Sequence, residues 1–112
     1  MNDCVFCAII ANQLPHKKIY EDDQVIVIED ISPKAPIHYL IIPKVHVKDL
    51  TSLGKEQLHL AQAIANAAQQ IASKNPDAAD FRLLINNGYN AGQRVFHLHA
   101  HFLAGRIAGE EL

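Results

Sequence analysis

Apolar residues recur along this chain with two different periods, which divide it into strands and helices. Alternation of apolar and polar residues is typical of a strand with one buried face, and a spacing of three to four residues is typical of an amphipathic helix. The longest helical pattern covers residues 55–74 and ends at Asn75-Pro76-Asp77. Its predicted apolar stripe consists of Leu58, Ala61, Ile64, Ala65, Ala68, Ile71 and Ala72.

Shorter apolar runs on either side of this helix predict the rest of the fold. A short N-terminal helix is predicted over residues 5–11, and the polar turn Glu21-Asp22-Asp23 is typical of a hairpin. Two prolines make residues 31–36 a loop. The predicted strands cover residues 18–20, 24–29, 38–42, 81–85 and 95–103. Strands joined by hairpins, with one long helix inserted, indicate an α+β fold with an antiparallel sheet of about five strands.

The last of these strands carries the most specific pattern of the chain, Val95-Phe96-His97-Leu98-His99-Ala100-His101-Phe102-Leu103. Strict alternation predicts a strand that presents three imidazoles on one face. Imidazole changes its charge near neutral pH, which suits it to nucleophilic and acid–base work or to metal binding. Burying three polar rings on one face for packing alone would be costly. The run therefore predicts a functional strand.

The spacing of these histidines argues against one shared ion. Alternate side chains of a strand lie roughly 6.6 Å apart, and the outer two of three lie roughly 13 Å apart. Zinc–nitrogen bonds measure only about 2.0 Å, so two neighbours could reach one ion but all three could not. We therefore expect His97, His99 and His101 to have separate tasks.

Composition narrows the class of protein. A chain of 112 residues is expected to form one domain, residues 1–112, with a core of its own. Its 49% apolar and 20% charged residues are typical of a soluble globular protein, and its net charge of −2 does not favour nucleic-acid binding. Apolar stretches are too short for a membrane span. The start Met1-Asn2-Asp3-Cys4 lacks the basic residues of a signal peptide, so a cytoplasmic location is expected.

The two cysteines form a C-x-x-C spacing, Cys4-Val5-Phe6-Cys7, which has three interpretations. Zinc binding needs two further ligands, which histidines elsewhere could supply. A thioredoxin-like redox pair normally follows a strand, and only three residues precede Cys4. In the third interpretation both are small buried side chains on the N-terminal helix. A structural disulfide is not expected in a reducing compartment.

The loop before the histidines, residues 86–93, combines two glycines with several amide side chains. Glycine lets a backbone approach a ligand closely, and successive N–H groups can form an anion-binding nest. Such a loop is also a common simple turn. Its position directly before the histidines makes it a candidate phosphate loop.

Together these residues resemble the histidine triad (HIT) family of nucleotide hydrolases and transferases, whose hallmark is His-φ-His-φ-His-φ-φ, with φ an apolar residue. Here the hallmark reads His97-Leu98-His99-Ala100-His101-Phe102-Leu103. The resemblance covers essentially the whole chain, and the segment Asp30-Ile31-Ser32-Pro33 is most similar to the Hint branch, the purine nucleoside phosphoramidases. It implies a HIT-like fold and a homodimer in which the sheets of two protomers join.

The resemblance also implies roles for individual residues. His99 is the expected nucleophile, which attacks the α-phosphorus and carries a nucleotidyl intermediate, while His101 contacts phosphate oxygens and His38 completes the cluster. Asp30 is expected to accept hydrogen bonds from the ribose hydroxyls, with Ile31 lining that pocket. The phosphate is assigned to Asn86, Gly92, Gln93 and Arg94, and an apolar purine slot to Val5, Phe6, Ile9, Ile28 and Leu40.

This assignment agrees with general chemistry. A neutral imidazole is a competent nucleophile, and its phosphorus adduct divides one difficult displacement into two easier ones. N–H donors and a protonated histidine are expected to stabilise the phosphate charge, and a neighbouring histidine can supply the proton that an amine leaving group needs. No metal is required for catalysis.

Two further features follow from the resemblance. Position 94 is Arg, where the family often has a small hydroxyl residue that bonds the leaving group; arginine can still bind phosphate. Some bacterial members carry zinc bound by a cysteine pair and two histidines, and the matching positions are Cys4, Cys7, His46 and His97. That Cys2His2 set is a closed, structural arrangement.

The expected function is hydrolysis of purine nucleoside phosphoramidates or aminoacyl adenylates to the nucleoside monophosphate. One alternative is a diadenosine polyphosphate hydrolase. Another is a zinc-stabilised purine nucleotide-binding protein with little turnover. His16 and His59 are expected to be surface or interface residues.

Overall fold

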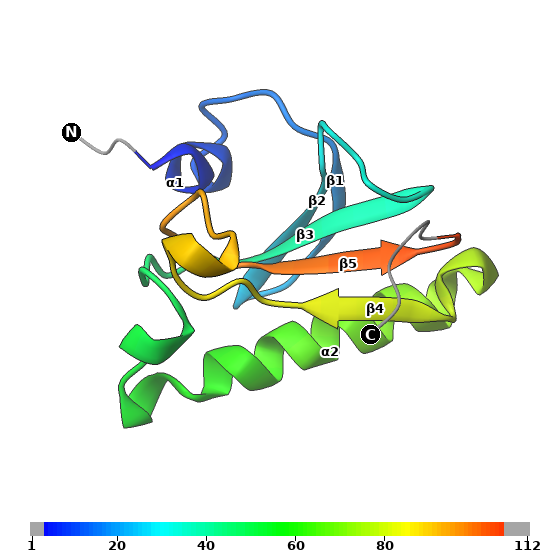
Figure 1. Cartoon of the computed structure of the whole chain (residues 1–112). Coiled ribbons are helices and arrows are strands. Elements are labelled where there is room, and N and C mark those ends of the chain that lie inside the picture. The colour runs from blue at the N-terminus through cyan, green and yellow to red at the C-terminus, as the bar shows by residue number, and fades with distance from the viewer. Residues whose placement is uncertain (1–3, 107–112) are drawn as a thin grey trace.

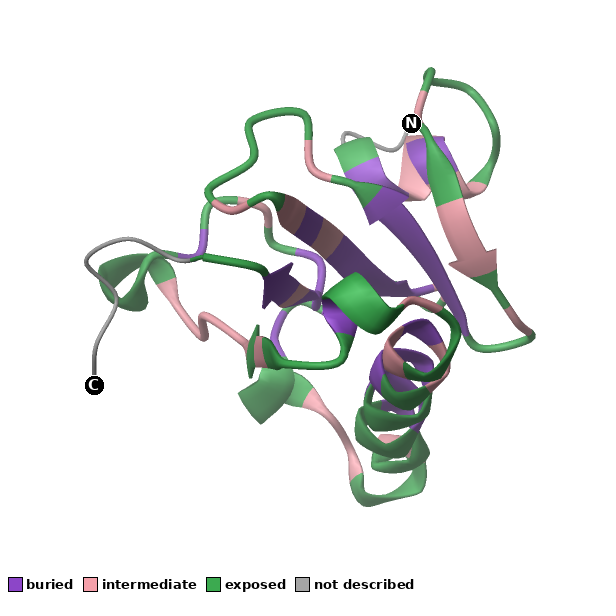
Figure 2. Cartoon of the chain, turned by 90° about the vertical axis from the view of Figure 1, so that its right-hand side faces the viewer, coloured by how far each residue is buried: buried purple, intermediate pink, exposed green. Residues whose placement is uncertain are grey.

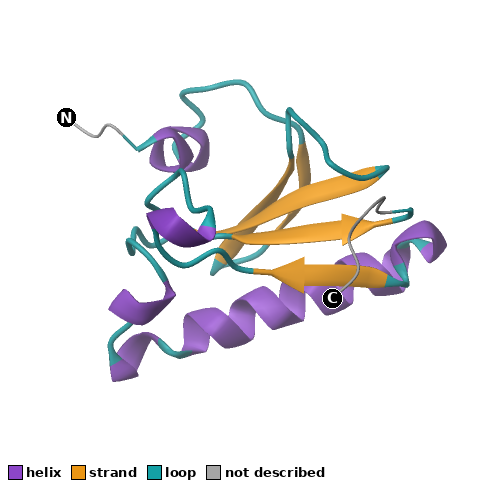
Figure 3. Ribbon diagram, viewed as in Figure 1, coloured by secondary structure: helices purple, strands orange, loops and turns teal. Residues whose placement is uncertain are grey.

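The computed structural model describes residues 4–106, in which five strands form one antiparallel sheet in the order β1-β2-β3-β5-β4 (Figure 1). The strands are β1 (Lys18–Glu21), β2 (Val25–Glu29), β3 (Ile37–Pro43), β4 (Phe81–Leu84) and β5 (Ala100–Ala104). Helix α1 (Val5–Ile10) and helix α2 (His59–Lys74) lie on opposite sides of the sheet, as Figure 3 shows. The predicted α+β fold is confirmed. The remaining residues of the predicted domain, 1–3 and 107–112, lie outside the described range.

Side-chain alternation divides the interior into two layers. Val25, Val27 and Ile41 point to the face that α2 covers. Their neighbours in sequence, Ile26 and Ile42, point to the opposite face, where α1 adds its own apolar side chains. Strand β2 is buried on both faces for this reason, and Figure 2 shows the buried strands between the two helices. In the part of the chain that is described, no helix has the length and apolar character needed to cross a bilayer.

Helix α2 uses a different stripe from the predicted one. Leu58, Ala61 and Ala65 are exposed, while Ile64, Ala68 and Ile71 are buried as predicted. The α-helix begins at His59, after a separate 3-10 turn at Lys55–Gln57, so Leu58 precedes it. Alanines occur all around this helix, and the sequence supports two overlapping stripes. The buried residues are Leu60, Ala63, Ile64, Ala67, Ala68 and Ile71.

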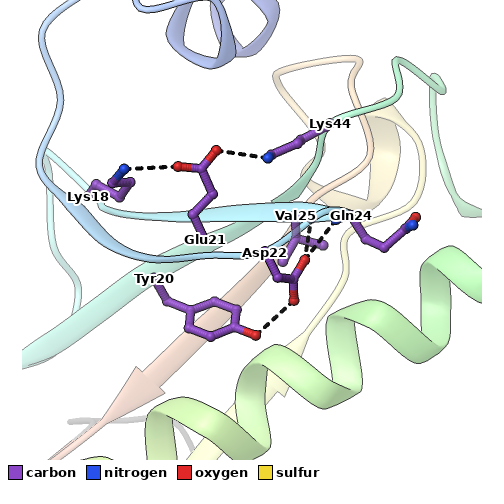
Figure 4. A network of polar contacts seen from close by, with 7 residues as sticks. All are labelled: Lys18, Tyr20, Glu21, Asp22, Gln24, Val25 and Lys44. Atoms are coloured by element: carbon purple, nitrogen blue, oxygen red, sulfur yellow. Dashed lines mark hydrogen bonds and ion pairs between the residues drawn. The ribbon is translucent and has the colours of Figure 1, made fainter.

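A polar network holds the hairpin between β1 and β2 (Figure 4). The Oδ1 atom of Asp22 accepts hydrogen bonds from the backbone N–H groups of Gln24 and Val25, at 2.8 and 2.9 Å, which confirms the predicted turn. Glu21 bonds Lys44 at the end of β3 and Lys18 on its own strand, at 2.8 and 2.9 Å. These lysines lower the pKa of Glu21 to about 2.

The predicted histidine strand is wrong in its first half. Strand β5 begins only at Ala100, and residues 95–97 form a bend. The backbone N–H of Leu98 donates to the carbonyl oxygen of Val47 at 2.7 Å. Val47 lies beyond Pro43, the last residue of β3, so the segment before Ala100 is not part of the sheet. Alternation nevertheless continues: Leu98, Ala100 and Phe102 pack in the cluster under α2. The rings of His97 and His99 contact Phe6 of α1, and His101 lies beside His99, so the three imidazoles lie on the side of the chain that α1 covers, as predicted.

Candidate active site and metal centre

His99 lies in the segment that leads into β5, and its ring is buried. Its Nδ1 lies 2.7 Å from the backbone carbonyl oxygen of His97. A carbonyl can only accept, so Nδ1 carries the proton and Nε2 keeps its lone pair. Burial lowers the pKa of His99, against the effect of that hydrogen bond and of Asp30, so the ring is neutral at pH 7. His99 thus has the electronic state of a nucleophile.

His38 and His101 lie on the adjacent strands β3 and β5, and the register places them on the same face. The backbone N–H of Lys34 donates to Nδ1 of His38 at 3.0 Å, so the proton of a neutral His38 ring lies on Nε2. That Nε2 lies 2.9 Å from Nδ1 of His101. His101 therefore accepts through Nδ1 and keeps its own proton on Nε2. Backbone groups thus define the tautomers of all three histidines.

His101 is uncharged in the free protein. Burial, followed by the proximity of His99 and His38, lowers its pKa to about 4. The sequence led us to expect a protonated histidine beside the phosphate. In the free protein that residue is not His101, because burial destabilises the charged form of its ring. The neutral ring can still offer an N–H hydrogen bond to a phosphate oxygen.

Asp30 completes this cluster. Its Oδ1 accepts the backbone N–H of Ser32 at 2.7 Å, and its Oδ2 lies 3.4 Å from Nε2 of His38. The side chain of Asp30 is 17% exposed, so a ligand can reach it. The neighbouring Ile31 is 96% exposed and lies open beside the carboxylate.

An apolar wall stands beside His99. The ring of Phe6 meets the His99 ring edge-on, with centroids 4.9 Å apart. Phe6 and Ile9 of α1 pack in one cluster with Ile28 and Leu40 of the sheet. Of the five residues predicted for the purine slot, Val5 alone stands at the surface, 40% exposed.

The loop before the triad is shaped by two glycines with positive φ, Gly88 at 94° and Gly92 at 103°. The Asn86 amide lies beside Gly92, and a Cβ atom at position 92 would be in van der Waals contact with that amide, at 3.6 Å. Gln93 is buried and fully engaged: its Oε1 accepts the N–H of Gly88 at 2.8 Å and its Nε2 donates to the carbonyls of Lys48 and Val95. The Gln93 side chain therefore supports the loop and is not free for a phosphate.

Arg94 lies at the surface of the same loop. Its guanidinium stacks on the ring of Tyr89, 4.0 Å from the centroid, and donates through Nη1 to the backbone carbonyls of Tyr89 and Gln93. These contacts involve Nη1 alone. The remaining N–H groups of the guanidinium can bind an anion.

His97, the first histidine of the triad, belongs to a different cluster from His99 and His101. His97 joins Cys4, Cys7 and His46, and one ligand atom from each lies within 4.8 Å of the others. Measured separations are 3.2 Å from Cys4 Sγ to His97 Nδ1, 3.3 Å from Cys7 Sγ to His46 Nδ1, and 3.1 Å between the two Nδ1 atoms. The predicted division of labour among the triad histidines matches this arrangement.

This cluster has the geometry of a tetrahedral site. Zinc bond lengths to nitrogen and sulfur imply edges of about 3.3–3.8 Å between ligand atoms, within a few tenths of an ångström of the measured values. The Nε2 of His97 donates to the carbonyl oxygen of Pro43 at 2.7 Å, which leaves the lone pair on Nδ1, inside the cluster. Burial raises the pKa of the Cys4 thiol, and a bound cation would offset that by stabilising the thiolate. The residues therefore fit zinc.

Three backbone groups that define this site were not predicted from the sequence: the N–H of Lys34 and the carbonyls of Pro43 and His97. Side-chain patterns carry no signal for them. The two remaining histidines, His16 and His59, bond backbone carbonyls of Leu14 and Glu56 and belong to neither cluster.

Comparisons with known proteins agree with this geometry. A family model described as scavenger mRNA decapping enzyme C-terminal binding matches residues 3–111. Protein HitA of Neisseria gonorrhoeae is 39% identical over 103 residues, which are 92% of this chain and 96% of that protein.

Solved structures show the same fold. A HIT family hydrolase from Clostridium thermocellum is 42% identical with a TM-score of 0.92, and the match covers 100% of this chain and 98% of that one. A zinc-bound histidine triad family protein from Mycobacterium smegmatis is 37% identical with a TM-score of 0.81, over 96% of this chain and 78% of that one. Sequence identity along nearly the whole length, and a fold shared to this degree, show that the chain belongs to the histidine triad family.

Proposed function

We propose that this protein hydrolyses purine nucleoside phosphoramidates or aminoacyl adenylates to the nucleoside monophosphate, as a member of the Hint branch. The observation that carries the proposal is the state of His99: Nδ1 donates to the His97 carbonyl, and Nε2 keeps a lone pair on a neutral ring. A ring in this state can attack phosphorus without prior loss of a proton.

The reaction proceeds in two displacements at phosphorus. First, Nε2 of His99 forms a bond to the α-phosphorus, the bond from phosphorus to the leaving group breaks, and a leaving amine takes a proton from water. Water then attacks the same phosphorus, the bond to His99 breaks, and the monophosphate is released. The attacking water loses one proton, which neutralises the hydroxide left when the amine was protonated. The Nε2–H of His101 donates to the non-bridging oxygens in both steps.

The remaining roles concern binding. The wall formed by Phe6, Ile9 and their sheet partners would receive the purine, and Ile31, which is almost fully exposed, would become covered by the nucleoside. Asp30 would accept the ribose hydroxyls through Oδ2. Asn86, Gly92 and Arg94 would surround the phosphate, with Gln93 supporting their loop.

We also propose a structural zinc ion on Cys4, Cys7, His46 and His97. When bound, zinc contributes folding free energy and no open coordination position. Cys4 is the N-cap of α1, so the ion would connect this helix to the segment that carries the nucleophile.

A homodimer is proposed through strand β4. It is an edge strand, and its exposed Phe81 and Leu83 lie on one side of it. Pairing of two such edges would join the sheets of two protomers and cover these side chains.

A substrate panel tests the proposed function. We expect adenosine 5′-phosphoramidates and aminoacyl adenylates to have a higher kcat/KM than diadenosine polyphosphates. Faster cleavage of diadenosine polyphosphates would support the alternative hydrolase, and tight AMP binding without turnover of any substrate would support a binding protein. Either result would overturn the proposal.

A further inference from the structure

The Nε2–H group of His38 has two acceptors and one proton. Nδ1 of His101 lies 2.9 Å away, at ordinary hydrogen-bond distance, and Oδ2 of Asp30 lies 3.4 Å away, which is long. The 2.9 Å contact is the hydrogen bond, and the Asp30 carboxylate oxygen attracts the same proton electrostatically from a longer distance. How strongly His38 bonds His101 depends on what else Asp30 Oδ2 accepts.

The two oxygens of Asp30 have different surroundings. The Oδ1 atom is engaged by the N–H of Ser32 at 2.7 Å, within the turn that positions the carboxylate. The Oδ2 atom remains, and it is the one that faces His38. Because the side chain of Asp30 is 17% exposed and that of His38 only 4%, a ligand reaches the carboxylate and not the ring.

Asp30, His38 and His101 have the composition of a metal site, with ligand atoms within 4.8 Å. The Lys34 N–H excludes His38 as a ligand, because it occupies Nδ1 and places the ring proton on Nε2, where the ion would bind. His97 is the opposite case, because its Nε2 proton points to Pro43 and its Nδ1 lone pair faces the cysteines. This trio is therefore a hydrogen-bond relay.

We propose that Asp30 is a positioning residue that couples ribose recognition to the His38–His101 hydrogen bond. This inference rests on the proposed function, in which Asp30 accepts the ribose hydroxyls. A ribose hydroxyl that donates to Oδ2 reduces the attraction of that oxygen for the His38 proton, and the hydrogen bond from Nε2–H to His101 becomes stronger. Since neighbouring hydrogen bonds polarise one another, His101 becomes a stronger Nε2–H donor to the phosphate. A substrate without ribose hydroxyls leaves the attraction of Asp30 unchanged.

Nuclear magnetic resonance of protein labelled with 15N-histidine tests this coupling without any turnover. Adenosine and 2′,3′-dideoxyadenosine are each added to saturation, confirmed by titration calorimetry. We expect adenosine to move the His38 Nε2–H proton resonance downfield and dideoxyadenosine to leave it in place. In Asp30→Ala the two nucleosides should give the same resonance. Equal shifts in the wild-type protein, with both nucleosides bound, would overturn the inference and leave the proposed function intact.

Single-turnover rates supply the second measurement. At saturating substrate, the wild-type protein should cleave adenosine phosphoramidate several-fold faster than its 2′,3′-dideoxy analogue, and Asp30→Ala should cleave both at one rate. If the hydroxyls contribute only to binding, they change KM and leave the saturated rate unaltered, which would contradict the coupling. Absence of both adenosine and AMP binding would overturn the proposed function together with the inference.

Discussion

Nδ1 of His99 donates to the backbone carbonyl of His97 at 2.7 Å, while the ring of His97 points away from it, toward the cysteines. One residue therefore serves two clusters: its carbonyl orients the candidate nucleophile, and its side chain belongs to the candidate metal centre. Any displacement of His97 moves the acceptor that defines the tautomer of His99.

Replacement of the nucleophile should separate chemistry from binding. His99→Ala removes the attacking atom and leaves Asp30 and the apolar wall in place, so turnover should fall by roughly 10³-fold or more while AMP still binds. Steady-state kinetics and titration calorimetry measure the two properties. His59→Ala, at an exposed histidine of α2, is the matched control. Near-normal turnover by a folded His99→Ala protein would contradict the mechanism.

Zinc should be present at one equivalent per protomer in protein purified without chelator or added metal. His46→Ala should lower this content well below one equivalent and lower the melting temperature, by roughly 4–6 °C for each kcal/mol lost in a chain of this size. Elemental analysis and thermal unfolding provide the measurements, with His16→Ala as the control. Wild-type protein that lacks zinc and has two freely titratable thiols would support the interpretation that both cysteines are only packed side chains.

Acidification should destabilise the fold through His101. Its pKa is about 4 in the folded protein and near its ordinary value of 6.5 in the unfolded chain. Between these values the unfolded state binds more protons, so stability falls as the pH is lowered from 6.5 to 4 and is unaffected above 6.5. His101→Gln should lose less melting temperature between pH 7.5 and pH 5 than wild type. An identical loss in both proteins would contradict this origin.

Arg94 should affect leaving-group preference. If a hydroxyl at this position assists an amine leaving group, as the family resemblance implies, Arg94→Ser should raise kcat for phosphoramidates several-fold. Arg94→Ala removes the same contacts with Tyr89 and supplies no hydroxyl, so it is the comparison that isolates the effect. Equal rates in the two variants would show that the hydroxyl plays no part.

The edge of β4 should determine the oligomeric state. Leu83→Lys places a charge on the exposed side of this strand and should convert a dimer into a monomer, as measured by sedimentation equilibrium. Leu58→Lys changes a leucine that is also exposed, beside α2, and should leave the dimer intact. A dimer that survives Leu83→Lys would place the interface elsewhere.

The sequence predicted the elements of this fold well because strands and helices have different periods. It misplaced the start of β5, since alternation continues through His97 and His99 although Leu98 bonds Val47 and not a neighbouring strand. It also chose the wrong stripe on α2, because alanines such as Ala61 and Ala63 are interchangeable in pattern and differ only in what packs against them.

The site was predictable as a set of residues and not as a set of tautomers. Spacing alone indicated that the three triad histidines do not share one ion, and the family resemblance assigned His97 to the cysteines. Which nitrogen carries each proton depends on main-chain partners such as the Lys34 N–H, and these are brought together only by the tertiary fold. The same holds for Gln93, whose side-chain Nε2 donates to the backbone carbonyls of Lys48 and Val95.

The contact between Cys4 and His97 spans 93 positions of the chain, and it has a consequence for biosynthesis. During translation the cysteines leave the ribosome well before His97 is added, because 93 positions separate Cys4 from it. Until then both thiols lack their last partner and are open to oxidation. Oxidative damage to this protein should therefore fall on newly made chains rather than on mature ones, and pulse-labelled protein from peroxide-treated cells should carry most of the modified cysteine.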